Sequence, residues 1–224
     1  MFFLPTAFGR PATGLTLVVA AAALVCLPVF AEAPLVRVCP WAAVGAGLGL
    51  WAAGRAWRHH PWGQLLLGLA TCWLAGSAYW GWLRAEPTWH LPVESLPLLW
   101  LWPRLWRNQW GLAEGFFLGS LLGTAITDGY FYLTGLVPIW RTLMGLEGDI
   151  LAVIAQGQPL LQQAVTQVLT PWGLGWAALL GAGLVALGGW AYGRPGDRWK
   201  ALTGAVWGTL IVDGLFWVST LPTR

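Results

Sequence analysis

Charged side chains are scarce in this sequence. Lys, Arg, Asp and Glu make up 9% of its 224 residues, whereas hydrophobic residues make up 57%. Soluble domains carry about 25% charged residues, so we expect the lipid bilayer to surround most of this chain. In lipid only helices and closed barrels satisfy the backbone polar groups, and the apolar runs here lack the alternation of a barrel strand. The composition therefore predicts an all-α membrane protein.

Cysteine and clustered basic residues are also sparse. The three cysteines form no CxxC pair, which argues against a disulfide framework or a zinc site. The net charge of +3 is scattered and no basic tract is present. We therefore expect no metal and no nucleic-acid partner.

Tryptophan, in contrast, is abundant, with 19 residues, many of them at the ends of apolar runs. Indole rings prefer the headgroup level of a bilayer, so most of these residues fit an aromatic belt. The alternative is a ring-shaped ligand stacked on some of them. Chlorophyll, carotenoid or lipid would be the candidates for such a ligand, and no other cofactor is expected.

Six apolar runs predict about six membrane-spanning helices in a single domain, 1–224. They cover approximately residues 15–30, 41–57, 64–83, 112–136, 172–192 and 201–221. Pro159–Leu169 carries leucine and valine on one helical face and glutamine on the other, which predicts an amphipathic helix outside the apolar slab. The segment Arg84–Asn108 is polar, and its apolar middle is too short to span. We expect this segment to be re-entrant or interfacial.

Residues 119–131 and 204–216 form a weak internal repeat, with seven of thirteen positions identical at a constant offset. One intervening span makes the two copies parallel. Small residues allow close helix contact in lipid, so we expect the copies to pack, with their aspartates inside the bundle at similar depth. The repeated residues are Gly119, Gly123, Thr124 and Asp128 in the first copy, and Gly204, Gly208, Thr209 and Asp213 in the second.

Three interpretations of the repeated aspartates stay open. Asp-Gly can mark a helix end, the carboxylate can form a structural bond between helices, or Asp128 and Asp213 can form a proton or cation site. In each copy, Thr four residues before Asp lies on the same helical face and can bond to it.

The block from residue 80 to residue 94 holds the densest group of titratable side chains, namely Arg84, Glu86, His90 and Glu94. His90 and Glu94 have helical spacing, but Pro92 between them argues against a regular helix. We expect these groups near the headgroups, with Glu86 or Glu94 paired to Arg84, Arg104 or Arg107. An acid–base role is the alternative to such ion pairs.

Four segments carry a resemblance to a known family: LPVFAEAPLVRVCPW, LAGSAYWGWLRAEPTWHLPVE, FFLGSLLGTAITDGYFYL and PIWRTLM. From about Leu27 to Met144 the chain resembles the cyanobacterial multi-pass membrane proteins of the domain of unknown function DUF3120. The resemblance implies a thylakoid or plasma membrane location and supplies no activity. Pro92-Val93-Glu94 is also similar to the Pro-x-Glu motif of small membrane-embedded lycopene cyclases, although Ser95 stands where these have a second acid.

Three functions follow from these observations. The favoured one is a non-catalytic accessory or assembly protein for a photosynthetic membrane complex. The alternatives are an intramembrane enzyme acting on an isoprenoid or pigment, and a small proton-coupled transporter using Asp128 and Asp213.

Overall fold

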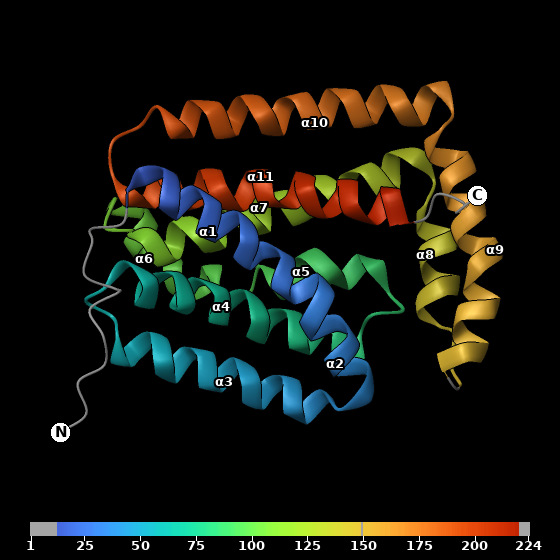
Figure 1. Ribbon diagram of the computed structural model, residues 1–224, viewed down its shortest axis with the longest axis horizontal. Coiled ribbons are helices and arrows are strands. Elements are labelled where there is room, and N and C mark those ends of the chain that lie inside the picture. The colour runs from blue at the N-terminus through green and yellow to red at the C-terminus, as the bar shows by residue number, and fades with distance from the viewer. Residues whose placement is uncertain (1–12, 149, 220–224) are drawn as a thin grey trace.

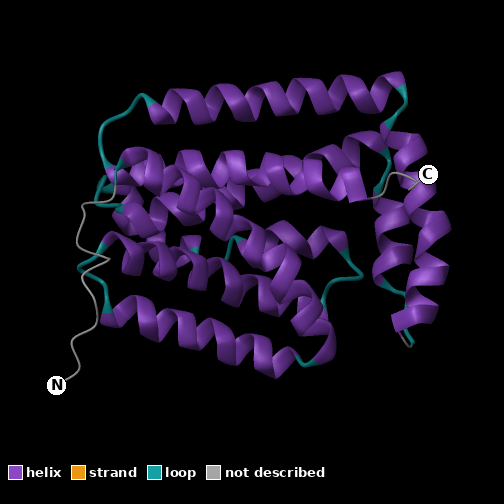
Figure 2. Cartoon of the chain, in the orientation of Figure 1, coloured by secondary structure: helices purple, strands orange, loops and turns teal. Residues whose placement is uncertain are grey.

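The computed structural model describes residues 13–148 and 150–219 as helices joined by short loops, with no strand in these ranges (Figures 1 and 2). The all-α prediction is confirmed. The last two residues of the expected 201–221 span lie outside the described residues. The elements are α1 (Gly14–Leu27), the π-helical turn η2 (Pro28–Glu32), α2 (Ala33–Val38), α3 (Pro40–Ala56), α4 (Pro61–Trp82), the 3-10 turn η3 (Pro87–Trp89), α5 (His90–Glu94), α6 (Leu98–Trp106), α7 (Leu112–Thr134), α8 (Val137–Met144), α9 (Ile150–Val168), α10 (Pro171–Tyr192) and α11 (Asp197–Ser219).

Proline and capping side chains set where the long helices begin. α3, α4 and α10 each begin with a proline, whose missing N–H needs no helical partner at that position. The Thr170 hydroxyl accepts the backbone N–H of Gly173 at 3.0 Å, and the Glu114 carboxylate accepts that of Gly111 at 2.7 Å. These caps satisfy backbone donors that the first turn leaves free.

α4, α7 and α11 all begin at the same end of the bundle. The residues at their starts, His60, Gly111 and Asp197, line one shallow pocket there. α4 and α7 are therefore parallel, and the chain between them must return along the bundle through η3, α5 and α6 (Figure 1). This differs from the re-entrant or interfacial segment expected over Arg84–Asn108. The hydrophobic periodicity of the sequence does not reveal this return path, because η3, α5 and α6 are short.

The repeat glycines divide between two helix contacts. A Cβ on Gly119 would lie 2.6 Å from the Leu202 carbonyl oxygen, so α7 and α11 approach at backbone distance. Gly204 faces α1 instead, where a Cβ would overlap the Val18 carbonyl oxygen. Thus α7 and α11 pack against each other as expected, but only the α7 glycines lie in this contact. The α11 glycines lie in the contact with α1 instead.

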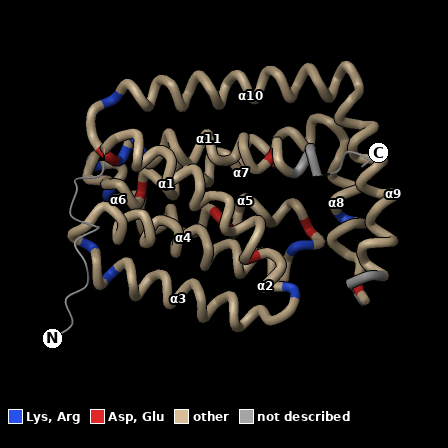
Figure 3. The backbone as a smooth tube through the Cα atoms, in the orientation of Figure 1, with Lys and Arg blue, Asp and Glu red and all other residues tan. Residues whose placement is uncertain are grey.

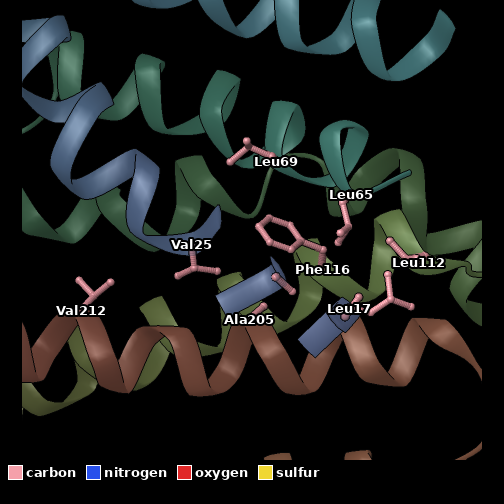
Figure 4. Packing of buried hydrophobic residues seen from close by; sticks show 10 residues of the cluster. Leu17, Val25, Leu65, Leu69, Leu112, Phe116, Ala205 and Val212 are labelled. Carbon is pink, nitrogen blue, oxygen red and sulfur yellow. The ribbon is translucent and has the colours of Figure 1, made fainter. Parts of the chain in front are cut away.

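The main hydrophobic cluster joins α1, α4, α7 and α11 (Figure 4). Phe116 from α7 is fully buried between the leucines of α4 and the small residues of α1 and α11. The other buried members of the cluster are Leu17, Ala21, Val25, Leu65, Leu69, Leu112, Ala201, Ala205 and Val212. α3 packs on α4, and α10 packs on α11, so these two helices flank the core.

α8 and α9 lie across the end of the bundle where α7 finishes (Figure 1). The amphipathic helix expected over Pro159–Leu169 is longer than expected, because α9 begins at Ile150 and contains Pro159. Val153, Gly157 and Leu161 are spaced four residues apart and line one cavity. The face of α9 that lines the cavity therefore runs past Pro159.

Two of the described helical segments are long and apolar enough to cross a membrane by length and composition, Gly14–Val38 and Pro171–Tyr192. α3 is shorter, at 17 residues. Glycine, tryptophan and polar residues dilute the apolar content of α4, α7 and α11. The six-span arrangement expected from the sequence is therefore not confirmed by this criterion.

The close approach of α1 and α11 predicts that Gly204→Ala destabilises the protein by about 1–3 kcal/mol, because the added methyl group overlaps the α1 backbone. The measurement is the melting temperature of the purified protein in detergent. Gly214→Ala is the matched control, since a Cβ there meets nothing within 4 Å among the described residues. Equal melting temperatures for the two variants would contradict the contact.

Candidate active site

The centre of the candidate site is the imidazole of His90, which lies between two carboxylates. Its Nδ1 is 2.9 Å from Asp128 Oδ1 on α7, and its Nε2 is 3.1 Å from Glu94 Oε1 on α5. His90 is 13% exposed, and both carboxylate side chains are 18% exposed. The structure therefore brings together three of the side chains singled out in the sequence.

α5 is helical despite Pro92, contrary to the expectation. Pro92 occupies the third position of the helix, where a backbone N–H has no partner in the preceding turn. The helix then holds His90 and Glu94 one turn apart on one face. This is why the two side chains meet.

Aromatic rings fix the orientation of the imidazole. His90 stacks on Tyr79 with centroids 4.3 Å apart and planes 26° apart, and it meets the edge of Trp80 at 5.5 Å. The Tyr79 hydroxyl donates to the Arg84 carbonyl oxygen at 3.3 Å. α4 thus supplies a rigid wall behind the imidazole.

The surroundings of His90 favour its protonated form. A carboxylate oxygen lies within hydrogen-bond distance of each ring nitrogen, Asp128 Oδ1 at Nδ1 and Glu94 Oε1 at Nε2. A protonated imidazole donates from both ring nitrogens, one to each carboxylate. The group is an acid held between two bases, an arrangement suited to proton transfer.

The cluster lines a cavity of about 1520 Å³ between the bundle and the α8–α9 pair. This volume exceeds the roughly 300–1,000 Å³ of typical ligand sites. Most of the wall is apolar. The predicted polar residues that line it are Arg84, His90, Glu94, Thr124, Asp128, Thr209 and Asp213.

Asp213 lines the same cavity as Asp128, and its Oδ2 accepts the Thr127 hydroxyl at 3.0 Å. The two aspartates therefore lie near one another along the α7–α11 contact. The expected bonds from Thr124 and Thr209 to the aspartates are replaced. Thr209 donates to the Val206 carbonyl oxygen at 2.8 Å, and Asp128 bonds to His90.

The prediction of ion pairs in the polar segment was wrong, because each charged group has a different partner from the one expected. Glu86 pairs with Arg141 of α8 at 3.1 Å, and both groups are about half exposed. Arg104 pairs with Glu114 of α7, and Glu94 pairs with His90. Arg84 donates to the Trp80 carbonyl oxygen at 3.5 Å. The cause is the return path of the chain, which separates Glu86 and Glu94 from Arg104 and Arg107.

Sequence reasoning missed Glu32, which is fully buried in η2 and accepts the Ser77 hydroxyl at 2.7 Å. A carboxylate inside an apolar run was the signal that could have found it. The adjacent Pro28, Val29 and Ala33 line the cavity.

Four buried polar atoms have no hydrogen-bond partner within residues 13–148 and 150–219. They are Glu32 Oε2, Arg84 Nε, Asp128 Oδ2 and Trp140 Nε1. Arg84, Asp128 and Trp140 line the cavity. In the part of the chain that the structure describes, no group of three His, Cys, Asp or Glu side chains has an arrangement that could hold a metal ion.

Comparison with known families places this arrangement in a family context. A family model described as protein of unknown function (DUF3120) matches residues 21–221. The chain belongs to the DUF3120 family. The match extends beyond the range 27–144 that carries the resemblance in the sequence, so α9, α10 and α11 belong to the shared domain. No curated protein and no solved structure matches this DUF3120 chain.

The contact between His90 and the two carboxylates predicts that the imidazole stabilises the fold. His90→Gln should lower the melting temperature, because it leaves at least one of the carboxylates of Glu94 and Asp128 without its hydrogen-bond donor.

The measurement is the melting temperature of wild type and His90→Gln in detergent. His59→Gln is the control, because His59 is exposed and its ring contacts Arg58 rather than a carboxylate. Equal melting temperatures for the two variants would contradict a stabilising contact at His90.

Proposed function

We propose that this DUF3120 protein is a multi-pass membrane enzyme that uses Glu94, His90 and Asp128 for acid–base chemistry on a lipid-soluble isoprenoid or pigment. The observation that carries the proposal is the position of this cluster in the wall of a large, mostly apolar cavity. A protein that acted only through packing would need neither the cavity nor the buried acid and bases.

The surface supports placement in a membrane. Lys and Arg gather near the two ends of the bundle, and the few charged residues between these ends are acidic (Figure 3). Large apolar side chains point outward along α3 and α10, including Leu48, Trp51, Leu179 and Val185, which are 48–62% exposed. Lipid contact satisfies such side chains without cost. We place α1 with α2, α3, α4, α7, α10 and α11 across the bilayer, with the polar segment returning among them.

The acid–base cluster suits a proton-driven rearrangement. An acid in the cavity adds a proton to a carbon–carbon double bond, and a carboxylate removes a proton from a neighbouring carbon. The substrate is rearranged with no net change in atoms or electrons, so no oxidant or reductant is needed. Glu94 is the carboxylate of the Pro-x-Glu motif, and Asp128 is the second acidic group that Ser95 does not supply.

The accessory function remains the second candidate, and α6 favours it. None of the α6 residues is buried, and Leu99, Trp100, Trp102 and Trp106 are 59–79% exposed. Such an aromatic surface fits lipid or another membrane protein, for example a photosynthetic complex in a cyanobacterial thylakoid or plasma membrane. Co-purification of a photosynthetic complex with tagged protein from mildly solubilised membranes, unchanged by substitutions at Glu94 and Asp128, would favour this function.

A proton-coupled transporter is the third candidate, because Asp128 and Asp213 line one cavity. Uptake into proteoliposomes that is lost in both Asp128→Asn and Asp213→Asn would support it. Enzyme action requires His90 and Glu94 as well, and it requires a product that differs from the substrate.

The enzyme proposal predicts that deletion of the gene alters the isoprenoid or pigment profile of the host. Wild-type protein should restore this profile, whereas Asp128→Asn and Glu94→Gln should reduce the activity about 10²–10⁴-fold. The measurement is chromatography of extracted pigments from strains with equal protein levels.

Asp197→Asn is the control, since it makes the same chemical change at the opposite end of the bundle, where Asp197 opens α11. Full restoration of the profile by Asp128→Asn would refute the enzyme proposal.

A further inference from the structure

Basic side chains at one end of the bundle lack acidic partners. Seven Lys and Arg residues lie at the end where α4, α7 and α11 begin, on the left in Figure 3. In the part of the chain that the structure describes, only Arg104 of these seven pairs with a carboxylate, that of Glu114. At the opposite end Arg141 pairs with Glu86. The first end therefore has a surplus of positive charge, which attracts anions.

The shallow pocket at this end presents hydrogen-bond donors. Arg58 and Arg198 line it, together with His59 and His60. A backbone N–H of α4 donates to His60 Nδ1 at 3.4 Å, and Arg58 Nε donates to His59 Nε2 at 3.1 Å. Because an imidazole nitrogen that accepts a hydrogen bond carries no proton, the other nitrogen of each ring is an N–H donor. Among the described residues, Asp197 is the one carboxylate that lines the pocket, so the lining suits an anionic oxygen group.

Aromatic rings hold other basic residues of this end at the edge of the bundle. Three cations lie over aromatic rings, 4.0–5.5 Å from the ring centroids. The pairs are Arg55 with Trp51, Arg194 with Trp190, and Lys200 with Tyr192. The three rings are 41–49% exposed and belong to α3 and α10, the helices that flank the core. In the proposed membrane arrangement such rings lie at the boundary between acyl chains and head groups, which places the cations beside the head groups.

We propose that this end of the protein binds the anionic head groups of membrane lipids, phosphodiesters such as that of phosphatidylglycerol. The phosphate oxygens accept from the donors of the pocket, and the acyl chains lie against the outward-facing rings of α3 and α10. A zwitterionic head group also carries a cation, which the surplus positive charge repels. This inference goes beyond the acid–base chemistry and uses only the placement of the helices in the membrane.

The test compares phosphatidylglycerol with phosphatidylcholine of the same acyl chains. Purified full-length protein, freed of lipid in a neutral detergent, is titrated with each lipid, and the bound lipid is counted by native mass spectrometry. The wild type should bind phosphatidylglycerol about tenfold more tightly, since each Lys or Arg near an anionic lipid strengthens binding about fivefold.

Arg58→Gln should weaken the binding of phosphatidylglycerol about fivefold and leave that of phosphatidylcholine unchanged. Arg58→Lys keeps the charge and should retain most of the binding. Arg198→Gln should give a similar loss, and its melting temperature is measured because Arg198 also donates to the carbonyl oxygens of Asn108 and Trp110. Arg141→Gln is the matched control, since it removes the same charge at the opposite end and should change the binding of neither lipid.

Equal binding of the two lipids by the wild type, or the same loss in Arg141→Gln as in Arg58→Gln, would overturn the inference. Release of bound phosphatidylglycerol by an equal concentration of soluble glycerol phosphate would overturn it as well and assign the pocket to a free phosphate ester. Equal binding of the lipids together with an acidic protein that co-purifies with wild type, but not with Arg58→Gln, would assign this end to a protein partner instead.

Discussion

The packing of the polar segment depends on one charged contact, the imidazole of His90 between Glu94 and Asp128. A lone buried carboxylate or imidazolium is expensive in an apolar interior, whereas the three groups together satisfy one another. The contact ties α5 to α7, and stacking on Tyr79 ties it to α4. Without it, α5 would have little reason to enter the bundle, because of its five residues only Val93 is buried.

The glycines of α7 determine where this contact can form. At Gly119 and Gly123 the α11 helix approaches so closely that no side chain fits between the two helices. This approach places Thr127 beside Asp213 and leaves Asp128 on the cavity side of α7. The same small residues of α7 thus allow close backbone packing and position the polar cluster at the cavity.

The long helices could be predicted from the sequence, and the polar segment could not. Continuous apolar runs with proline at the start gave the bounds of α3, α4 and α10 to within a few residues. The scarcity of charge and the aspartates inside apolar runs also pointed to Asp128 and Asp213. These signals are local in the sequence, so they can be recognised without knowing which helices pack together.

The partners of His90, Glu86 and Arg104 depend on long-range topology instead. Nothing in the sequence shows that α4 and α7 are parallel, so the ends of the segment between them were expected on one side. Glu32 was missed for a related reason: its partner Ser77 lies 45 residues away on α4. Periodicity records which face of a helix is apolar, but it does not record which helix that face meets.

The parallel course of α4 and α7 also redistributes the basic residues between the two ends of the bundle. Of the ten Lys and Arg residues between 13 and 219, seven lie at the end where α4, α7 and α11 begin: Arg55, Arg58, Arg104, Arg107, Arg194, Arg198 and Lys200. Cytoplasmic loops of membrane proteins are enriched in such residues. In the proposed membrane arrangement we therefore expect this end to face the cytoplasm. The cavity beneath α8 and α9 would then lie towards the opposite compartment, from which its protons would be exchanged.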